Sequence, residues 1–400
     1  MKLLLTTPAR LYKTKDGKYW TEIVYGYDFF LRYLTIFENI LLVAHTEECS
    51  FEAAEGMLRV DGPNLNIFEA PFPHGKIDYL KKYLSIRKVI KKSIKGCDAA
   101  ILRIPDQLAF QLYGFIKRKR IPTAVEVTSD SWDLFLPGAV KSLLRPFLRV
   151  VWYINQKRLC ADVLGTSYVT EFALQKRYPP KRAIYGDGFT NFCTDVNLTE
   201  TFFYKPRDYK GDPEKVYSVI HIATDIGNVA KGYKELLAAL SILHSRGIKT
   251  KLTLIGGGKL SAESISIIKN GGYMNNIRLT GKITKPEELV KELCEADLFV
   301  FPSYREGLPR SVLEAMATGL PCITTDLPGT RELLGKECLV PVKDVEILTD
   351  KIQKLIGSPE ELTRQSRLNY EKALDFLVSI IQKRREDFYT KLKNAALKRL

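Results

Sequence analysis

The stretch from Phe301 to Thr330 constrains the fold of this 400-residue chain more than any other. It opens on the apolar run Asp297–Pro302, which is typical of a buried parallel strand. A helical pattern follows, with Pro309 suited to its first turn and Gly319 suited to the position just past its end. A second apolar run, Pro321–Thr325, begins almost at once. These signals predict a strand–helix–strand unit with a ligand site in the loop after the first strand, beside the helix N-terminus.

Two glutamates frame this predicted site. Glu306 lies in the loop, and Glu314 lies in the second turn of the predicted helix. A carboxylate beside a phosphate-binding helix start would repel phosphate, so we expect each to accept hydrogen bonds from ribose or hexose hydroxyls. The alternative is structural: Glu306 favours the helix dipole and Glu314 lies on the helix surface.

The segment Glu306–Pro321, EGLPRSVLEAMATGLP, closely resembles the Glu–seven residues–Glu signature of the family 4 retaining glycosyltransferases, which have the GT-B fold. The match includes the Ala-Met-Ala, Gly and Pro that follow the second glutamate. The resemblance implies that Glu314 binds the donor ribose and that Glu306 lies near the transferred sugar. It also implies that the donor diphosphate binds the turn and helix start after Glu306, formed by Gly307, Leu308, Pro309 and Ser311.

The resemblance assigns a second group of donor contacts to Lys231. A lysine at the start of a helix opposes the helix dipole unless an anion neutralises it. Members of the family bind the donor diphosphate with a Lys-Gly pair at this place, so we expect Lys231 to bind it and to act in catalysis with Glu306. The alternative is an exposed lysine at the start of a helix. The family usually has an arginine five or six residues earlier, where this chain has Asp225 and Ile226, so the second cation is unassigned.

Two further turns resemble parts of the family's nucleotide site. Gly256 and Gly257 follow an apolar strand pattern, as does the family's glycine turn beside the nucleotide, although a simple turn explains them equally well. Lys282 and Ile283 match the segment that lines the base.

The N-terminal half is expected to hold the acceptor. Its first predicted strand, Lys2–Thr6, is followed by a predicted polar loop, Pro8–Lys18. The family often places glycines after this strand, close to phosphate or acceptor, and Gly17 is the glycine in this loop.

A second acceptor segment, Glu126–Asp133, follows another predicted strand and is expected to face the cleft. Within it we expect Asp130 to contact the acceptor or the transferred sugar and to act in catalysis, with Asp133 on the acceptor side. The alternative makes Asp130 the N-cap of the next helix.

Apolar runs and helical patterns alternate along both halves, which predicts an α/β chain with two Rossmann-like, doubly wound domains. The resemblance implies that the domains face a cleft and that the C-terminal helices cross back to the N-terminal domain. We expect an acceptor-binding domain over residues 1–195, a donor-binding domain over 196–375 and a returning helix over 376–400. Further elements are predicted at these positions: strands at Ile40–Ala44, Leu65–Phe68, Asp98–Ile104, Thr123–Val127, Asp162–Gly165, Val216–Ile222, Lys251–Ile255 and Ile277–Thr280, and helices at Ile23–Tyr33 and Tyr233–Ser245.

The net charge of +15 implies an anionic partner: nucleic acid, an acidic membrane surface or phosphorylated ligands. No zinc-ligand spacing, ribonucleoprotein motif or helix-turn-helix favours nucleic acid. The basic segment Lys76–Lys95 carries apolar residues at helical spacing and is typical of a helix on an anionic membrane, and Phe115–Arg120 and Lys141–Arg149 repeat the mixture. The alternative is a core-facing helix with a solvated lysine face. Seven scattered cysteines and short apolar runs predict a reduced, cytoplasmic chain. The basic segments fit a peripheral position on the inner membrane face.

We therefore predict a hexosyltransferase that takes a hexose from a nucleotide-diphosphate sugar and transfers it to a glycan or polyprenyl-diphosphate-linked acceptor. We expect the transfer to proceed with retention and to serve cell-surface polysaccharide biosynthesis. No Asp-x-Asp motif is present, so we expect no metal and no cofactor, with Lys231 and helix amides supplying positive charge. One alternative is a nucleotide-sugar epimerase of the same fold, although no acid–base pair is visible. The other is a non-catalytic, membrane-associated sugar-nucleotide-binding protein, against which the intact Glu306 and Glu314 argue.

Overall fold

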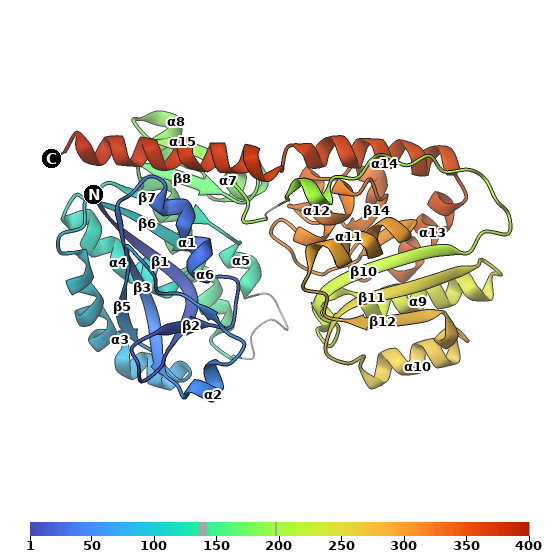
Figure 1. The fold of residues 1–400 in the computed structure, drawn as a ribbon, viewed down its shortest axis with the longest axis horizontal. Coiled ribbons are helices and arrows are strands. Elements are labelled where there is room, and N and C mark those ends of the chain that lie inside the picture. Colours follow the sequence, from blue (N-terminus) through green and yellow to red (C-terminus); the bar gives the residue numbers. More distant parts are fainter. Residues whose placement is uncertain (136–141, 197, 400) are drawn as a thin grey trace. The chain divides into compact units, whose positions relative to one another are not determined.

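The chain divides into two compact units in the computed structural model, which describes residues 1–135, 142–196 and 198–399 (Figure 1). Unit 1 comprises Met1–Thr194 and Gln382–Leu400, and unit 2 comprises Asp195–Ile381. The division between the units therefore falls at 194/195 and 381/382, where the sequence predicts 195/196 and 375/376. Most of helix α15 (Val378–Leu397) belongs to unit 1.

Unit 1 is built on a parallel sheet with the strand order β5-β3-β1-β6-β7-β8-β9. Its parallel strands are β1 (Lys2–Lys13), β3 (Asn39–Glu48), β5 (Leu65–Pro71), β6 (Ala99–Ile104), β7 (Thr123–Val127), β8 (Gly165–Tyr168) and β9 (Phe189–Phe192). Its helices include α1 (Tyr27–Leu34), α2 (Phe51–Ala54), α3 (Lys76–Ile90), α4 (Gln107–Arg118), α5 (Ser131–Leu134), α6 (Arg145–Asp162), α7 (Ala173–Arg177) and α8 (Lys181–Tyr185). This is the Rossmann-like organisation that the alternation of strand and helix patterns predicts.

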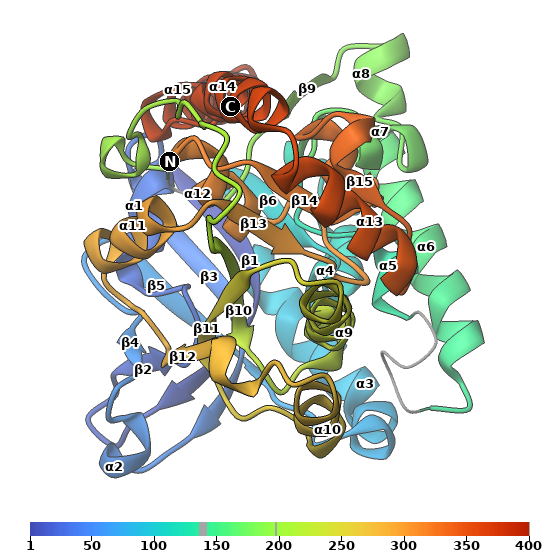
Figure 2. The ribbon, with the colours of Figure 1, turned by 90° about the vertical axis from the view of Figure 1, so that its right-hand side faces the viewer.

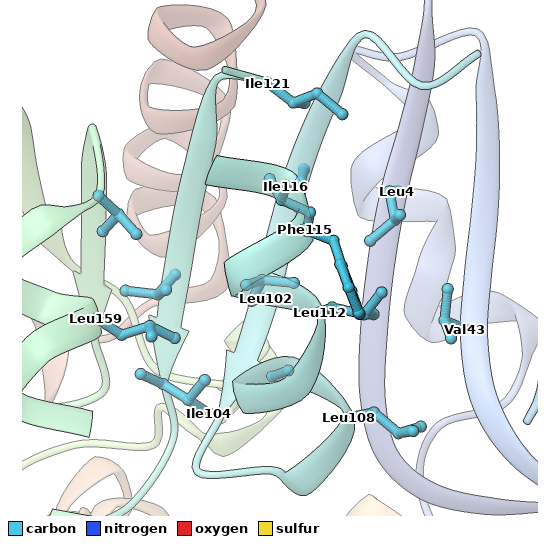
Figure 3. Close-up of a cluster of buried hydrophobic side chains, with 14 of the residues drawn as sticks. Leu4, Val43, Leu102, Ile104, Leu108, Leu112, Phe115, Ile116, Ile121 and Leu159 are labelled. Atoms are coloured by element: carbon cyan, nitrogen blue, oxygen red, sulfur yellow. The ribbon is translucent and has the colours of Figure 1, made fainter. Parts of the chain in front are cut away.

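Helices cover both faces of this sheet, because its central strands carry apolar side chains on both sides. Figure 3 shows one core, in which Leu102 and Ile104 of β6 lie beside Leu108 and Leu112 of α4. The other face is covered by α1 and by the C-terminal part of α15. Three residues of α15 pack in that second core with the leucines of β1, namely Phe388, Tyr389 and Leu392.

A buried ion pair ties α15 to the sheet of unit 1. Arg103 of β6 is 1% exposed and pairs with Glu126 of β7. The Glu126 carboxylate also accepts hydrogen bonds from the hydroxyls of Tyr33, at 2.8 Å, and Tyr389 of α15, at 2.6 Å. The expectation that the segment beginning at Glu126 faces an acceptor is therefore wrong for Glu126 itself, because its carboxylate is used inside the unit.

The predicted polar loop Pro8–Lys18 is also wrong over most of its length. Strand β1 continues to Lys13, because Ala9 and Leu11 are buried and the backbone pairs with the second half of β3. A short strand, β2 (Tyr19–Thr21), then returns antiparallel to β1 and pairs with β4 (Leu58–Arg59). Gly17 consequently lies in a hairpin turn, with a φ of +80° that favours glycine, and its N–H donates to the carbonyl of Thr14 at 2.9 Å.

The basic segment predicted as a membrane helix packs against the core instead. Ile86 and Ile90 of α3 are fully buried, and Ile94 in the following turn is 9% exposed. Lys81 and Lys88 are exposed on the opposite side. Helix α3 is thus a core-facing helix with a solvated lysine face, which was the alternative interpretation, and Phe115 and Ile116 of α4 are buried in the same core.

Unit 2 contains a parallel sheet with the order β12-β11-β10-β13-β14-β15. Its strands are β10 (Tyr217–Asp225), β11 (Thr250–Gly257), β12 (Ile277–Gly281), β13 (Leu298–Phe301), β14 (Cys322–Thr325) and β15 (Leu339–Val340). Its helices include α9 (Tyr233–Ser245), α10 (Ala262–Asn270), α11 (Pro286–Glu295), α12 (Arg310–Ala317), α13 (Val345–Ile356) and α14 (Pro359–Leu374). The predicted strands of this half and the helix Tyr233–Ser245 are confirmed, whereas the short strand β15 was not predicted.

The sheet of unit 2 is doubly wound around β10. Figure 2 shows α9, α10 and α13 on one side of the sheet and α11 and α12 on the other. The chain order runs outward from β10 to β12 on one side and from β13 to β15 on the other. The order therefore reverses between β10 and β13, which is the position where open α/β sheets bind ligands at the carboxyl ends of their strands.

Candidate functional site

The loops that follow β10 and β13 meet at this switch point in unit 2. The N–H of Tyr304 donates to the carbonyl of Ala230 at 2.9 Å, and the Ser303 hydroxyl oxygen lies 3.1 Å from the same carbonyl oxygen. Gly232 permits the approach: its φ is +75°, and a Cβ there would lie 1.9 Å from the carbonyl oxygen of Pro302. The two loops are therefore held together by backbone contacts that any larger residue at position 232 would disrupt.

Lys231 and Glu306 form an ion pair at the centre of this contact. The Lys231 Nζ lies 2.7 Å from the Glu306 Oε1, and the Ser303 hydroxyl donates to the same oxygen at 2.7 Å. The two side chains are 26% and 15% exposed. Lys231 is thus not the freely exposed lysine of the alternative interpretation, and Glu306 does more than favour a helix dipole. The structure brings together two residues that lie far apart in the sequence and were both predicted for the site.

An aromatic floor lies beneath the Lys231 ammonium. Its Nζ lies 5.4 Å from the ring centre of Phe301, which is stacked on His221 of β10 with 5.3 Å between ring centres. His221 is fully buried, and its Nδ1 donates to the carbonyl of Val300 at 2.8 Å. Burial lowers the pKa of His221 to about 4, so the imidazole is neutral at physiological pH. The rings beneath the Lys231 ammonium therefore carry no charge of their own.

Helix α12 begins directly after the loop that carries Glu306. Pro309 is its N-cap residue, one position before the predicted place, and no side chain caps the helix start. The first N–H groups of a helix have no acceptor within the helix, and the helix dipole makes this end positive. The N-terminus of α12, with Ser311 in its first turn and Gly307 and Leu308 just before it, therefore offers donors to an anion.

Glu314 occupies the second turn of α12, as predicted, but it does not lie on the helix surface. The residue is 4% exposed, and the Nε of Arg310 donates to its Oε1 at 2.6 Å. Burial raises the pKa of the Glu314 carboxyl above its ordinary value, and the charge of Arg310 opposes that rise. A buried carboxylate with a single cationic partner has further lone pairs with which to accept hydrogen bonds.

Sequence reasoning missed three residues of this loop. Arg305 precedes Glu306, is half-buried, and makes no ion pair within the part of the chain that the structure describes. Ser303 joins the two loops, and the Tyr304 hydroxyl donates to the Glu235 Oε1 of α9 at 2.6 Å. The position of Arg305 beside the first signature glutamate was the available signal, because the expected arginine before Lys231 is absent.

The remaining predicted donor residues lie at the carboxyl ends of neighbouring strands. A Cβ at Gly256, at the end of β11, would lie 2.1 Å from the carbonyl oxygen of Ala223, so glycine allows β11 to lie against β10 there. Gly257 is half-buried beside it. Lys282 is exposed and Ile283 is half-buried after β12. Contacts of these four residues with a nucleotide stay predictions.

Asp130 and Asp133 belong to unit 1 and follow β7. Asp130 is the N-cap of α5, accepting from the Trp132 N–H at 2.8 Å, as the alternative interpretation has it. Its carboxylate also pairs with Arg177 and accepts from the Tyr178 hydroxyl. Asp133 lies 3.3 Å from the same Arg177. These contacts give Asp130 a structural use, and acceptor contacts for Asp130, Asp133 and Gly17 stay predictions.

The described residues contain neither a metal cluster nor a membrane-spanning helix. Across residues 1–135, 142–196 and 198–399, no group of three or more His, Cys, Asp or Glu side chains is placed to hold a metal ion. Within the same ranges no helix is both long enough and apolar enough to cross a membrane. All seven cysteines are free thiols.

Comparison with known proteins agrees with this geometry. Residues 218–358 match the family described as glycosyl transferases group 1. The Staphylococcus aureus protein CapJ is 26% identical over 365 residues, which cover 90% of this chain and 88% of CapJ. The amylovoran biosynthesis glycosyltransferase AmsK of Erwinia amylovora is 32% identical over 166 residues, 39% of each chain.

Solved structures share the fold over the full length. Sucrose-phosphate synthase from Thermosynechococcus elongatus has a TM-score of 0.64 at 17% identity, covering 99% of this chain and 100% of that one. Anabaena HepE, in complex with UDP and glucose, has a TM-score of 0.58 at 16% identity, and each chain is covered completely.

Two Rossmann-like units, with a switch-point site in the second, define a protein of the GT-B fold class. The part of unit 2 from residue 218 to residue 358 is the part that matches the glycosyl transferases group 1 family.

Proposed function

We propose that this protein is a glycosyltransferase that moves a hexose from a nucleotide-diphosphate sugar to a hydroxyl of a glycan or lipid-linked glycan, with retention, in polysaccharide biosynthesis. The observation that carries the proposal is the Lys231–Glu306 pair beside the uncapped N-terminus of α12 at the switch point of unit 2. The names of relatives support the pathway: AmsK is named for amylovoran biosynthesis, and a Staphylococcus aureus relative, CapM, is named for capsular polysaccharide biosynthesis. HepE, a structural neighbour, was solved with UDP and glucose.

Each part of the donor has a partner in this proposal. The diphosphate binds the N–H groups at the start of α12 and replaces Glu306 as the ion-pair partner of Lys231. The Glu306 carboxylate then accepts hydrogen bonds from the transferred hexose. Arg305 is the second cation, in place of the arginine that the family usually has before Lys231. Glu314 accepts hydrogen bonds from the ribose hydroxyls. Charge that develops on the departing diphosphate is thereby stabilised by groups already in position.

The transfer step in this proposal has no enzyme nucleophile. The bond between the anomeric carbon and the diphosphate oxygen breaks while the acceptor oxygen bonds to the same face of that carbon. The acceptor proton passes to the departing diphosphate oxygen, so the products are the new glycoside and a nucleoside diphosphate. Lys231, Arg305 and the α12 N-terminus supply the positive charge for this step, and we propose that no metal is required.

The test of this proposal is a thermal-shift panel of nucleoside diphosphates and their sugars, each measured with and without EDTA. A ligand that binds only the folded chain, at ~100 times its Kd, is expected to add ~2.7 kcal/mol of stability. We expect a shift with ligands of one base, unchanged by EDTA. A shift that EDTA removes would contradict metal independence, and no shift with any ligand would overturn the donor assignment.

We also propose that unit 1 docks on an anionic membrane surface through α6 rather than α3. Helix α6 and the residues just before it expose a row of large apolar side chains at helical spacing. Phe147 is 65% exposed, Val150 is 45% exposed and Ile154 is 38% exposed, and Leu143 and Leu144 before the helix are also exposed. The exposed cations Lys157 and Arg158 lie on the same helix. Apolar residues beside cations are what anionic bilayers bind. The predicted segment Lys141–Arg149 overlaps this row, although Lys141 lies outside the described residues.

Substitution of Phe147 and Val150 by Asp is expected to abolish sedimentation with vesicles that contain anionic phospholipid. The reason is that the change removes buried apolar area in the bilayer and adds two repelling charges. The matched control is Leu84→Asp on α3, whose side chain is 75% exposed and whose substitution should leave binding unchanged. Equal loss in both variants, or no loss in the α6 variant, would contradict docking through α6.

A further inference from the structure

A large cavity lies in unit 1 at the edge of the sheet where β7, β8 and β9 begin. Its volume is about 890 Å³. Thr123 at the start of β7, Leu164 before β8 and Phe189 at the start of β9 line its floor. Because these strands are parallel, their amino ends share one edge of the sheet, opposite the edge from which the loop carrying Asp130 emerges. The cavity is therefore distinct from the segments predicted to bind the acceptor.

Cations dominate the wall of this cavity. Lys117 pairs with Asp162, and Arg182 pairs with Asp187 at 2.6 Å, and these are the two acidic residues of the lining. Four further cations line the cavity and have no acidic partner among the described residues: Arg120, Lys391, Lys398 and Arg399. Arg399 donates to the backbone carbonyl of Lys119, so its charge is not neutralised there.

The fold gives only part of the reason for this concentration of charge. Arg120 follows the C-terminus of α4, and a cation is favoured at the negative end of a helix dipole. Lys391 has no such reason, because it lies well inside α15. Cations gathered around one concave surface repel one another and concentrate anions from solution. The apolar side chains of Ile121, Val163 and Leu164 in the same cavity offer contact to an uncharged part of a ligand.

We propose that this cavity binds the phosphate or diphosphate group of a phosphorylated ligand. Arg120, Lys391 and Lys398 contact the phosphate oxygens, and the apolar floor contacts the group esterified to it. The ligand joins the end of α4 to the last turns of α15, so its binding stabilises the packing of α15 on unit 1. This site is separate from the donor site in unit 2 and does not depend on the function proposed for that site.

Inorganic pyrophosphate is the probe for the first test, titrated into the full chain by calorimetry. Each cavity variant is compared with the wild type, so that any binding at the donor site in unit 2 is common to both. Two charge reversals, Lys391→Glu with Lys398→Glu, are expected to weaken pyrophosphate binding roughly tenfold or more, because each removes a charge-assisted contact. The matched control is Lys383→Glu, an exposed lysine of α15 outside the cavity, which should bind as the wild type does. The milder pair Lys391→Gln with Lys398→Gln repeats the test without added negative charge.

A second test separates a free phosphorylated ligand from a lipid headgroup. The same variants are sedimented with vesicles containing phosphatidic acid. Loss of pyrophosphate binding alone in the cavity variants identifies a soluble phosphorylated ligand, and loss of vesicle binding relative to Lys383→Glu identifies a lipid phosphate. If the cavity variants match the wild type in both measurements, the proposal is overturned.

Discussion

Replacement of Lys231 by Met is expected to lower kcat/KM for the donor by roughly 10²–10³, the cost of removing one preorganised group that stabilises developing charge. Methionine keeps an apolar stem over Phe301 and removes only the ammonium. The folded state should persist, because Ser303 still donates to Glu306 and the two loops keep their backbone contacts. Steady-state kinetics over a range of donor concentrations give the measurement.

The control for this substitution is Lys234→Met. Lys234 lies three residues further along, is 40% exposed, and pairs with Glu263 on the surface of unit 2. The Lys234→Met substitution changes the net charge by the same amount as Lys231→Met. Lys234 has no contact with the Glu306 loop, so the kinetics of this variant should match those of the wild type. Equal losses in the two variants would mean that overall charge matters rather than the Lys231 position. Full activity of Lys231→Met would make the Lys231–Glu306 pair a structural contact only.

The fold of unit 2 was predictable because its signals are local and agree with one another. The strands β10, β11 and β13 are mostly buried and mostly apolar in sequence, and Gly319 marks the end of α12 with a φ of +69°. The position of the site followed from the same pattern, because loops at the carboxyl ends of parallel strands share one edge. The positions of Glu306 and Glu314 could be predicted because both lie in one loop and the helix that follows it, so their spacing in the sequence was enough.

What was not predictable depends on contacts between distant parts of the chain. Strand β1 extends beyond Thr6 because the second half of β3 is there to pair with it, and no local pattern reveals that partner. Likewise, α3 and α6 both mix apolar and basic residues, but only packing decides that Ile86 is buried while Phe147 is exposed. The pairing of Lys231 with Glu306 required the strand order, which places β10 beside β13.

Replacement of Glu314 by Gln should separate donor binding from stability. The ionised carboxylate is the acceptor proposed for the ribose hydroxyls, and hydrogen bonds to charged groups contribute about 1.5–3 kcal/mol. Donor affinity is therefore expected to fall by roughly one to two orders of magnitude. Titration calorimetry with UDP, or with the base that the thermal-shift panel selects, measures the change. The exposed Glu371 of α14 provides the control, because Glu371→Gln alters charge equally without touching the site.

The same substitution should not destabilise the chain at neutral pH. Burial raises the pKa of Glu314 in the folded state, so the folded chain holds this proton more tightly than the unfolded chain does. The stability that this proton linkage contributes is fully present below the ordinary glutamate pKa of about 4.3 and is lost as pH rises through the raised folded value. Glutamine does not titrate, so the Tm of Glu314→Gln relative to the wild type should increase between pH 4 and pH 8. A relative Tm that falls over this range would mean that the ion pair with Arg310 outweighs the cost of burying the carboxylate. In the calorimetric test, unchanged donor affinity of Glu314→Gln would remove Glu314 from the site.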